Sequence, residues 1–164
     1  MWSRKNAMDK PMVRMTDLTA GEQQHLAGLE CPRFDTRPWV RGGPLAARRV
    51  AIVSSAGLIV RGDKPVMAND VRYRTIPHDT PAGDILMSHV SVNYDRTGFQ
   101  RDINVAFPRD RLAELAADGV IGAVAQNHYA TMGAVDPVGL EEQTRTLAGV
   151  LAREGVDSAL LLPV

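Results

Sequence analysis

Two polar clusters hold the residues of this sequence whose types could do chemistry. The first lies at 88–104 and offers an imidazole, amides, carboxylates and a guanidinium, from His89, Asn93, Asp95, Arg96, Asp102 and Asn104. The second lies at 126–129 and contains His128 and Tyr129. Histidine changes charge near neutral pH and therefore suits proton transfer. Loops that leave a rigid strand are common places for binding residues, so both clusters are candidate sites.

Every one of these residues also has a structural interpretation. The two histidines could be hydrogen-bonded residues at strand ends, and their positions alone favour this over catalysis. The neighbouring Asp and Arg residues at 95–96 and 101–102 could be surface ion pairs worth under about 1 kcal/mol each. The two asparagines could cap turns, because their side chains bond nearby backbone.

The elements that must position these clusters are predicted from the pattern of apolar residues. The expected helices are 21–26, 108–118 and 138–153, and the expected strands are 49–53, 71–76 at a sheet edge, 85–90, 120–125 and a buried final strand at 157–162. Strands that alternate with helices indicate parallel βαβ units. We therefore predict an α/β fold with a mostly parallel sheet and helices on both faces, in Rossmann-like or flavodoxin-like layers. Ligands bind beyond the carboxyl ends of such strands, so both clusters are expected at one edge.

The N-terminal part of the sequence is predicted to lie outside these layers. Residues 1–15 are expected to form a disordered tail, and 16–164 a single α/β domain. Three prolines and two glycines between Cys31 and Pro44 predict an extended N-terminal arm. Trp39 in this arm is expected to hold it against the core.

Composition excludes several functional classes. The 19 basic and 19 acidic residues balance, which gives no electrostatic case for nucleic acid or membrane as a partner. The sequence contains no secretory signal and no apolar run long enough to span a membrane, so a cytoplasmic location is expected. A single cysteine, Cys31, excludes an internal disulfide and a zinc knuckle.

Known cofactor motifs are also missing from the sequence. It has no dinucleotide-binding fingerprint, no Walker sequence and no Gly-x-Ser-x-Gly elbow, so no cofactor is predicted. A metal site of His89, His128 and a carboxylate, as in a metal-dependent hydrolase, is conceivable. Its spacing matches no known ligand pattern, and we predict no metal.

Several segments together resemble the selenoprotein B family. The run HVSVNYDRT at 89–97 is followed by DINVAFP at 102–108 and DRL at 110–112, and HYATMGA at 128–134 is similar to the family's His-Tyr-x-x-Met-Gly-Ala segment. The similarity covers most of residues 12–164. The family contains component B of the glycine, sarcosine and betaine reductases and the D-proline reductase selenoprotein.

The resemblance implies an oxidoreductase component that takes part in reductive cleavage at the α-carbon of glycine, sarcosine, betaine or D-proline. The nucleophile is a selenocysteine or a replacing cysteine, which must be deprotonated to react. The implied partners are the small amino acid or betaine substrate and other reductase subunits, among them a pyruvoyl-containing subunit and a thiol or selenol carrier protein.

The implied nucleophile directly follows a strand resembling 160–164, and Cys31 does not match its position. We therefore expect the sequence to be truncated at an in-frame UGA codon after Val164, and activity only if the full-length protein continues. The alternative is a catalytically incomplete binding or scaffold domain that pairs with reductase subunits.

The resemblance also implies roles for the residues of the two clusters. His89 and His128 are the expected catalytic residues, which would lower the pKa of the nucleophile or move a proton. Arg96 is expected to hold a substrate carboxylate through two hydrogen bonds. The expected substrate-binding residues are Asn93, Asp95, Arg96, Asp102, Asn104 and Tyr129.

Overall fold

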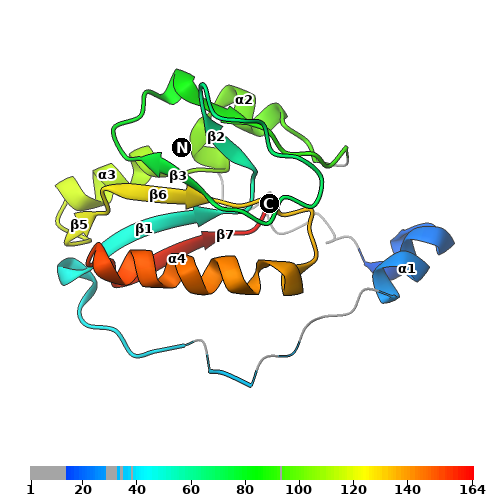
Figure 1. Ribbon diagram of the computed structural model, residues 1–164, viewed down its shortest axis with the longest axis horizontal. Coiled ribbons are helices and arrows are strands. Elements are labelled where there is room, and N and C mark those ends of the chain that lie inside the picture. Colours follow the sequence, from blue (N-terminus) through cyan, green and yellow to red (C-terminus); the bar gives the residue numbers. More distant parts are fainter. Residues whose placement is uncertain (1–13, 29–32, 34, 38, 93) are drawn as a thin grey trace, which may run out of the picture. The chain divides into compact units, whose positions relative to one another are not determined.

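The computed structural model describes residues 14–28, 33, 35–37, 39–92 and 94–164 (Figure 1). The chain divides into two compact units, Met1–Thr36 and Arg37–Val164. The predicted disordered tail, apart from its last two residues, lies outside the described residues. Cys31 in the predicted arm and the candidate site residue Asn93 also lie outside them.

The described residues of the first unit form a 3-10 turn (Met15–Asp17) and the short helix α1 (Ala20–Ala27), which lies where a helix was predicted. Its start is fixed by a capping box. The Glu22 N–H donates to Thr19 Oγ1 at 3.4 Å, and the Thr19 N–H donates to the Glu22 carboxylate at 2.9 Å. Gly28 ends the helix, as the sequence predicts.

The second unit is built on a mixed sheet whose central strand is β1. The strands β6, β1 and β7 run in the same direction in Figure 1. The strands of this sheet are β1 (Arg49–Ser54), β5 (Ala123–Val124), β6 (Asn127–Ala130), β7 (Ser158–Leu162) and the edge strand β3 (Arg74–Pro77). A separate antiparallel pair is formed by β2 (Leu58–Val60) and β4 (Ile85–Met87). β5, β6 and β7 pair with β1 in parallel, and β3 pairs with β6 antiparallel.

The α/β class is thus confirmed, but the prediction of a mostly parallel sheet is corrected to a mixed one. A parallel connection needs a crossover of a dozen or more residues, usually a helix. Residues 55–84, all of which the structure describes, contain no α-helix, so the chain returns through antiparallel pairs instead. The Rossmann-like or flavodoxin-like arrangement of layers stays a prediction.

The second polar cluster lies inside the sheet and not in a loop that leaves it, which corrects the sequence prediction. The predicted strand at 120–125 is reduced to β5, and the residues after it form β6. Val50 pairs with Val124 of β5, and Val53 pairs with Tyr129 of β6. Three residues of advance along β1 therefore correspond to five residues of advance along the neighbouring segment that contains β5 and β6. Two extra residues therefore bulge out between β5 and β6, and polar residues continue the sheet beyond the bulge.

The long helices start and stop largely where predicted. Helix α3 (Arg109–Ala117) begins directly after Pro108, and helix α4 (Glu141–Arg153) ends two residues before Gly155. α4 starts later than predicted, because Pro137–Leu140 forms a 3-10 turn. The first polar cluster was expected to form one long loop, but it contains the short helix α2 (Thr97–Arg101). None of the helices formed by the described residues is long and apolar enough to cross a membrane.

Successive residues of β6 point to opposite faces of the sheet, and each face meets a helix. On one face, His128 contacts Phe107, which packs in the apolar core with Leu112 of α3. On the other face, the Tyr129 hydroxyl donates to Glu154 at the end of α4. Helices therefore contact both faces, as predicted.

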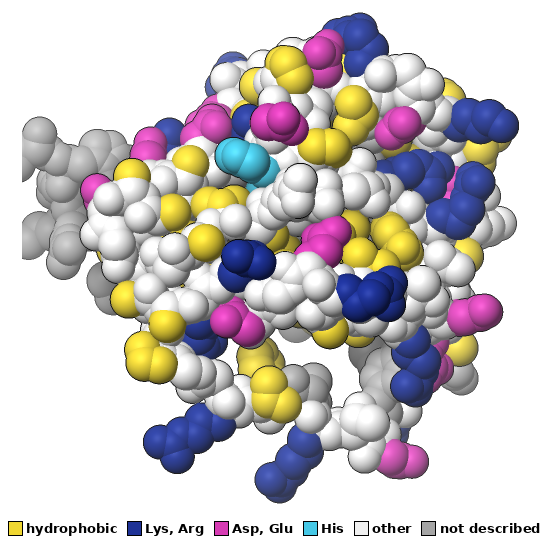
Figure 2. All heavy atoms as spheres, turned by 60° about the vertical axis from the view of Figure 1, so that its left-hand side comes forward, with side chains coloured by type: hydrophobic (Ala, Val, Ile, Leu, Met, Phe, Trp, Pro, Cys, Tyr) yellow, Lys and Arg dark blue, Asp and Glu magenta, His cyan; other side chains and the backbone are white. Residues whose placement is uncertain are grey.

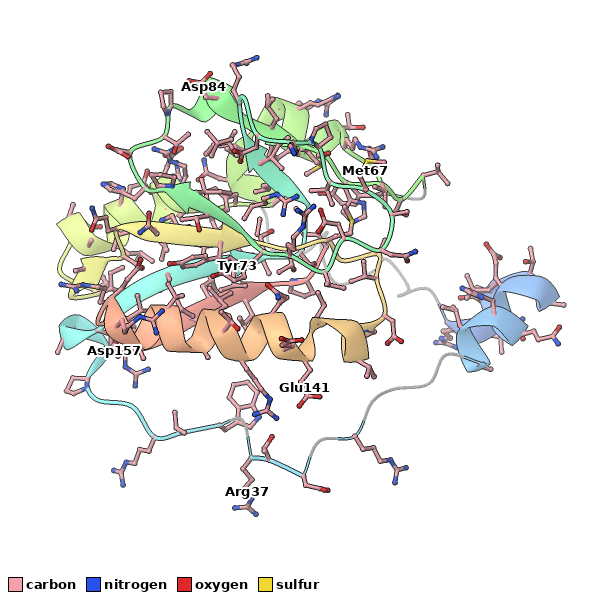
Figure 3. The ribbon with its side chains drawn as sticks, viewed as in Figure 1. Arg37, Met67, Tyr73, Asp84, Glu141 and Asp157 are labelled. Carbon is pink, nitrogen blue, oxygen red and sulfur yellow. The ribbon has the colours of Figure 1, made fainter. Side chains whose placement is uncertain are left out.

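The final strand β7 is an edge strand, which corrects the prediction that it is buried. Among the described strands only β1 pairs with it, and Leu161 is 67% exposed. At the start of both strands, Asp157 Oδ1 accepts from the Arg49 N–H at 3.0 Å, and Figure 3 labels Asp157 there. The register of β1 and β7 is therefore held at this end by a side chain.

The predicted contact of Trp39 with the core is wrong, because this side chain is 90% exposed. Residues 39–44 form neither helix nor strand, as the extended arm predicts. A polar contact holds this segment instead, since the Arg48 guanidinium donates to the Gly43 carbonyl at 2.6 and 2.8 Å. Figure 2 shows basic and acidic side chains intermixed on the face that it displays.

Candidate functional site

Three parallel strands end side by side at one edge of the sheet. Beyond β1, the Ser55 N–H donates to the Leu162 carbonyl of β7 at 3.0 Å. The Ser55 carbonyl accepts from the N–H of Gly133, which lies beyond β6, at 2.8 Å. Figure 1 shows the end of the chain at this edge, just beyond β7. The carboxyl ends of parallel strands are the expected place for a site.

An open hollow of about 260 Å³ lies at this edge, and its lining joins strand ends that are far apart in the sequence. The lining residues are His89, Ser91, Tyr94, Gly133, Ala134 and Val164. The loop that carries His89 is tied to the exit of β1, because the Ser88 N–H donates to the Gly57 carbonyl at 2.9 Å. Gly57 has a φ of 63°, and a Cβ there would lie 3.1 Å from the His89 Cα. A glycine thus allows the close approach of the two loops.

His89 is the one predicted catalytic residue that the structure places at the hollow. Its side chain is 7% exposed, its Nδ1 accepts from the Ser91 N–H at 3.2 Å, and its ring centroid lies 5.0 Å from that of Tyr94. Burial lowers the His89 pKa, and the positive charge of Arg96 lowers it further. The imidazole is therefore neutral at pH 7.

The hydrogen bond to Nδ1 decides which nitrogen of this neutral ring carries the proton. Because Nδ1 accepts, the proton lies on Nε2. Nε2 is buried and has no hydrogen-bond partner within the described part of the chain. A buried donor without a partner is costly, so this nitrogen is a polar group that the described fold leaves unsatisfied.

Arg96 contacts the backbone of the site loop. Its Nη2 donates to the carbonyl of His89 at 2.6 Å and to that of Ser91 at 3.1 Å. These contacts hold the loop in its turn around the guanidinium. Asp95 accepts from the N–H and the hydroxyl of Thr97, the first residue of α2.

Asp102 and Asn104 form a clamp at the start of α3. The Asn104 amide donates to Asp102 Oδ1 at 2.8 Å and to Asp110 Oδ2 at 2.9 Å, and Asn104 Oδ1 accepts from the Asp110 N–H at 3.0 Å. The hydrogen bonds from Asn104 lower the pKa of Asp102. Neither residue is among the described residues that line the hollow.

His128 is buried in the sheet and has a structural contact. It is 1% exposed, and its Nδ1 accepts from the N–H of Ile52 in β1 at 3.1 Å. This bond lies at the bulge between β5 and β6, so the side chain replaces a missing backbone acceptor. Burial, together with the smaller effects of the charges of His78 and Arg109, lowers the His128 pKa to about 4.

Tyr129 lies on the opposite face, where its buried side chain joins a partly buried hydrogen-bond cluster. Its hydroxyl donates to Glu154 Oε2 at 2.9 Å, and Asn127 donates to Glu154 Oε1 at 2.8 Å. Its ring packs edge-on against Tyr73, with centroids 5.8 Å apart, and Figure 3 labels Tyr73. Burial raises the Tyr129 pKa, and the bond to Glu154 raises it further.

Removal of the Tyr129 hydroxyl is therefore expected to destabilise the fold. Tyr129→Phe leaves a partly buried carboxylate oxygen of Glu154 without its donor and should lower the free energy of unfolding by about 1–3 kcal/mol. Urea unfolding followed by circular dichroism measures this change. Tyr73→Phe is the matched control, with an expected change below about 0.5 kcal/mol. Equal effects of the two variants would contradict the structural role of the hydroxyl.

The structure thus brings only part of the predicted site together. His89 lies at the hollow and Arg96 contacts the backbone of the His89 loop, whereas His128 and Tyr129 lie within the sheet. Groups of three or more His, Cys, Asp or Glu residues suited to a metal do not occur among the described residues.

Sequence reasoning missed Ser55, Ser91, Tyr94, Gly133 and Ala134. Two of these carried a usable signal, because Ser55 and Gly133 lie just beyond strands whose ends meet. The Tyr94 ring and the Ser91 N–H are adjacent to His89 only because of the loop conformation. Their places could not be inferred from spacing.

Comparisons with known proteins identify relatives of this chain. The sequence profile of the family described as glycine/sarcosine/betaine reductase selenoprotein B matches residues 21–163. The D-proline reductase subunit gamma of Acetoanaerobium sticklandii is 37% identical over 115 residues, which cover 68% of this chain and 47% of that protein. The chain thus spans about half the length of this relative. No solved structure matches the chain significantly.

Proposed function

The chain belongs to the glycine/sarcosine/betaine reductase selenoprotein B family, and we propose on this premise that it is a component of a reductase. The proposed reaction is reductive cleavage of a bond at the α-carbon of glycine, sarcosine, betaine or D-proline. The whole protein would act in the cytoplasm. A selenocysteine or cysteine directly after Val164 would be the nucleophile.

The observation that carries this proposal is the hollow where β1, β6 and β7 end. Val164 lines this hollow together with His89, so a residue that followed Val164 would start at its wall. The resemblance to the family gives the nucleophile the same position, after a strand like β7. Two independent arguments therefore support the same place for the reactive atom.

The proposed role of His89 follows from its protonation state. A neutral imidazole with its proton on Nε2 can donate a hydrogen bond to a thiolate or selenolate. Donation to the charged form lowers the pKa of the nucleophile, and a free cysteine with a pKa near about 8.5 needs such a shift to react at pH 7. We assign Arg96 the supporting role of holding the His89 loop.

The lining also bears on the proposed partners. None of its described residues carries a carboxylate that could bind a substrate amine. We propose that another subunit, such as one that contains a pyruvoyl group, binds the substrate amine. A thiol or selenol carrier protein would then exchange electrons or the product fragment at the same edge.

The experiment uses the full-length protein in its reductase complex and replaces His89. His89→Leu is expected to raise the pKa of the nucleophile and to lower kcat at pH 7 by about 10²-fold. The rate of substrate-dependent dithiol oxidation, measured with each of the four substrates, gives kcat. The pH dependence of iodoacetamide alkylation at the residue after Val164, followed by mass spectrometry, gives the pKa. His25→Leu, in helix α1, is the control and should change neither value.

Two results would count against these assignments. If none of the four substrates supports dithiol oxidation, the proposed reaction is wrong. If oxidation occurs but His89→Leu leaves both kcat and the alkylation profile unchanged, the role of His89 is wrong.

A second candidate function is a binding or scaffold domain without its own chemistry. The exposed edge strand β7 favours this candidate, because Leu160 and Leu161 are exposed side chains beside a strand edge with which no described strand pairs. The same experiment separates the two functions. The scaffold function predicts that the protein joins the reductase subunits. It also predicts that substrate protects no residue of the protein from alkylation.

A further inference from the structure

Ser55 connects the ends of three strands with three different polar groups. Its N–H donates to the Leu162 carbonyl of β7, and its carbonyl accepts from the Gly133 N–H beyond β6. Its hydroxyl oxygen accepts from the Val164 N–H at 2.8 Å. The exit of β1 is thus fixed to the exits of both neighbouring strands through one residue.

The hydroxyl is needed because the backbone ladder between β1 and β7 stops just before Val164. Ser54 pairs with Leu162, the last residue of β7. Pro163 follows, and proline has no N–H to donate. The next donor is the Val164 N–H, but Gly133 already bonds to the Ser55 carbonyl. The side chain of Ser55 therefore provides the acceptor that the backbone does not.

The carbonyl of Val164 lies close to the backbone of Gly133. A Cβ on Gly133 would lie 2.8 Å from the Val164 carbonyl oxygen and 3.0 Å from the Ser55 hydroxyl. A real Cβ essentially never lies 2.8 Å from another heavy atom, so the glycine at 133 leaves the space that the Val164 carbonyl occupies. Ser55 and Gly133 together form what we call the exit clamp.

We infer that Ser55 is a positioning residue that fixes the direction of the chain at Val164, so that the residue after it enters the hollow beside His89. The inference rests on the proposed function for the identity of that residue. The contacts of the exit clamp are independent of it. A hydrogen bond to the backbone one residue before a nucleophile controls its position without touching it, and small displacements at such positions cost large factors in rate.

The first measurement tests the clamp itself and needs no activity. In the 164-residue chain, Ser55→Ala should speed hydrogen exchange of the Val164 amide by about tenfold, because the amide loses its acceptor. Ser55→Thr keeps a hydroxyl and should restore slow exchange. Ser158→Ala, at the opposite end of β7, is the matched control and should leave exchange at Val164 unchanged.

The second measurement tests positioning in the full-length protein. Ser55→Ala should shift the midpoint of the pH profile for iodoacetamide alkylation upward by about one unit, and Ser55→Thr should restore it. Gly133→Ala keeps the hydroxyl but displaces Val164, so it should shift the midpoint in the same direction. This second variant keeps the test decisive if Ser55→Ala does not fold.

The outcomes separate the clamp from the proposed function. Unchanged Val164 exchange in Ser55→Ala would overturn the clamp, whatever the enzyme does. Faster exchange with an unchanged alkylation midpoint in both Ser55→Ala and Gly133→Ala would overturn the positioning role. Absence of alkylation at the residue after Val164, checked by mass spectrometry, would overturn the proposed function while the exchange result stands.

Discussion

Acidification from about pH 6.5 to about pH 4 is expected to destabilise the protein by about 3 kcal/mol through His128 alone. The unfolded chain binds a proton on this residue near pH 6.5, whereas the folded protein does so only near its pKa of about 4. Between these values the unfolded state holds more protons, so stability falls as the pH falls. The loss is absent above pH 6.5 and complete below about pH 4.

A variant without a titrating group isolates this effect from the carboxylates, which also titrate in acid. His128→Asn places an acceptor oxygen near the position of Nδ1, so the bond from the Ile52 N–H is retained in a neutral form. Urea unfolding at pH 7 and pH 4.5 should show a smaller loss of stability in the variant than in the parent protein. His25→Asn is the control and should behave as the parent. An identical pH dependence in the parent and His128→Asn would refute the assignment.

Truncation of Phe107 is expected to destabilise the protein more than loss of the Tyr129 hydroxyl does. The Phe107 side chain is 0% exposed and packs in the core that includes Ile52 and Leu112. Its ring also contacts that of His128 edge-on, with centroids 5.5 Å apart. Phe107→Ala should therefore lower the free energy of unfolding by about 3–5 kcal/mol.

Equilibrium urea unfolding at pH 7 measures this loss. Phe99→Ala is the matched control, because Phe99 is only partly buried at the margin of the same core. Its expected cost is about 1–2 kcal/mol. A cost below about 1 kcal/mol for Phe107→Ala would show that Phe107 is not at the centre of the core.

Elements whose signals are local could be predicted from the sequence. β1 is a continuous apolar run, and α3 and α4 have apolar faces with Pro108 before one and Gly155 after the other. β2 was missed because three residues give too little pattern to recognise. β6 was missed because its polar His128 is paired through a side chain, across a bulge that depends on the distant β1.

The candidate site was predicted in part, for a similar reason. His89 lies at the end of an apolar strand that the sequence predicts, so its position near a strand end could be predicted too. Asp102 and Asn104 have residue types that suit ligand binding, but capping a helix uses the same hydrogen-bonding groups. The contacts of Ser55 and Gly133 depend on which strands are neighbours, and the sequence alone does not specify strand order.

The bond between His128 and Ile52 also affects the order in which the sheet comes apart. Sheets commonly fray from their outer strands, where hydrogen bonds are open to water. Here one bond of the central strand depends on an imidazole that becomes a donor when it is protonated, and it can then no longer accept the Ile52 N–H. Acid is therefore expected to weaken a contact in the middle of the sheet, between β1 and β6, whereas fraying by heat is expected to start at its outer strands.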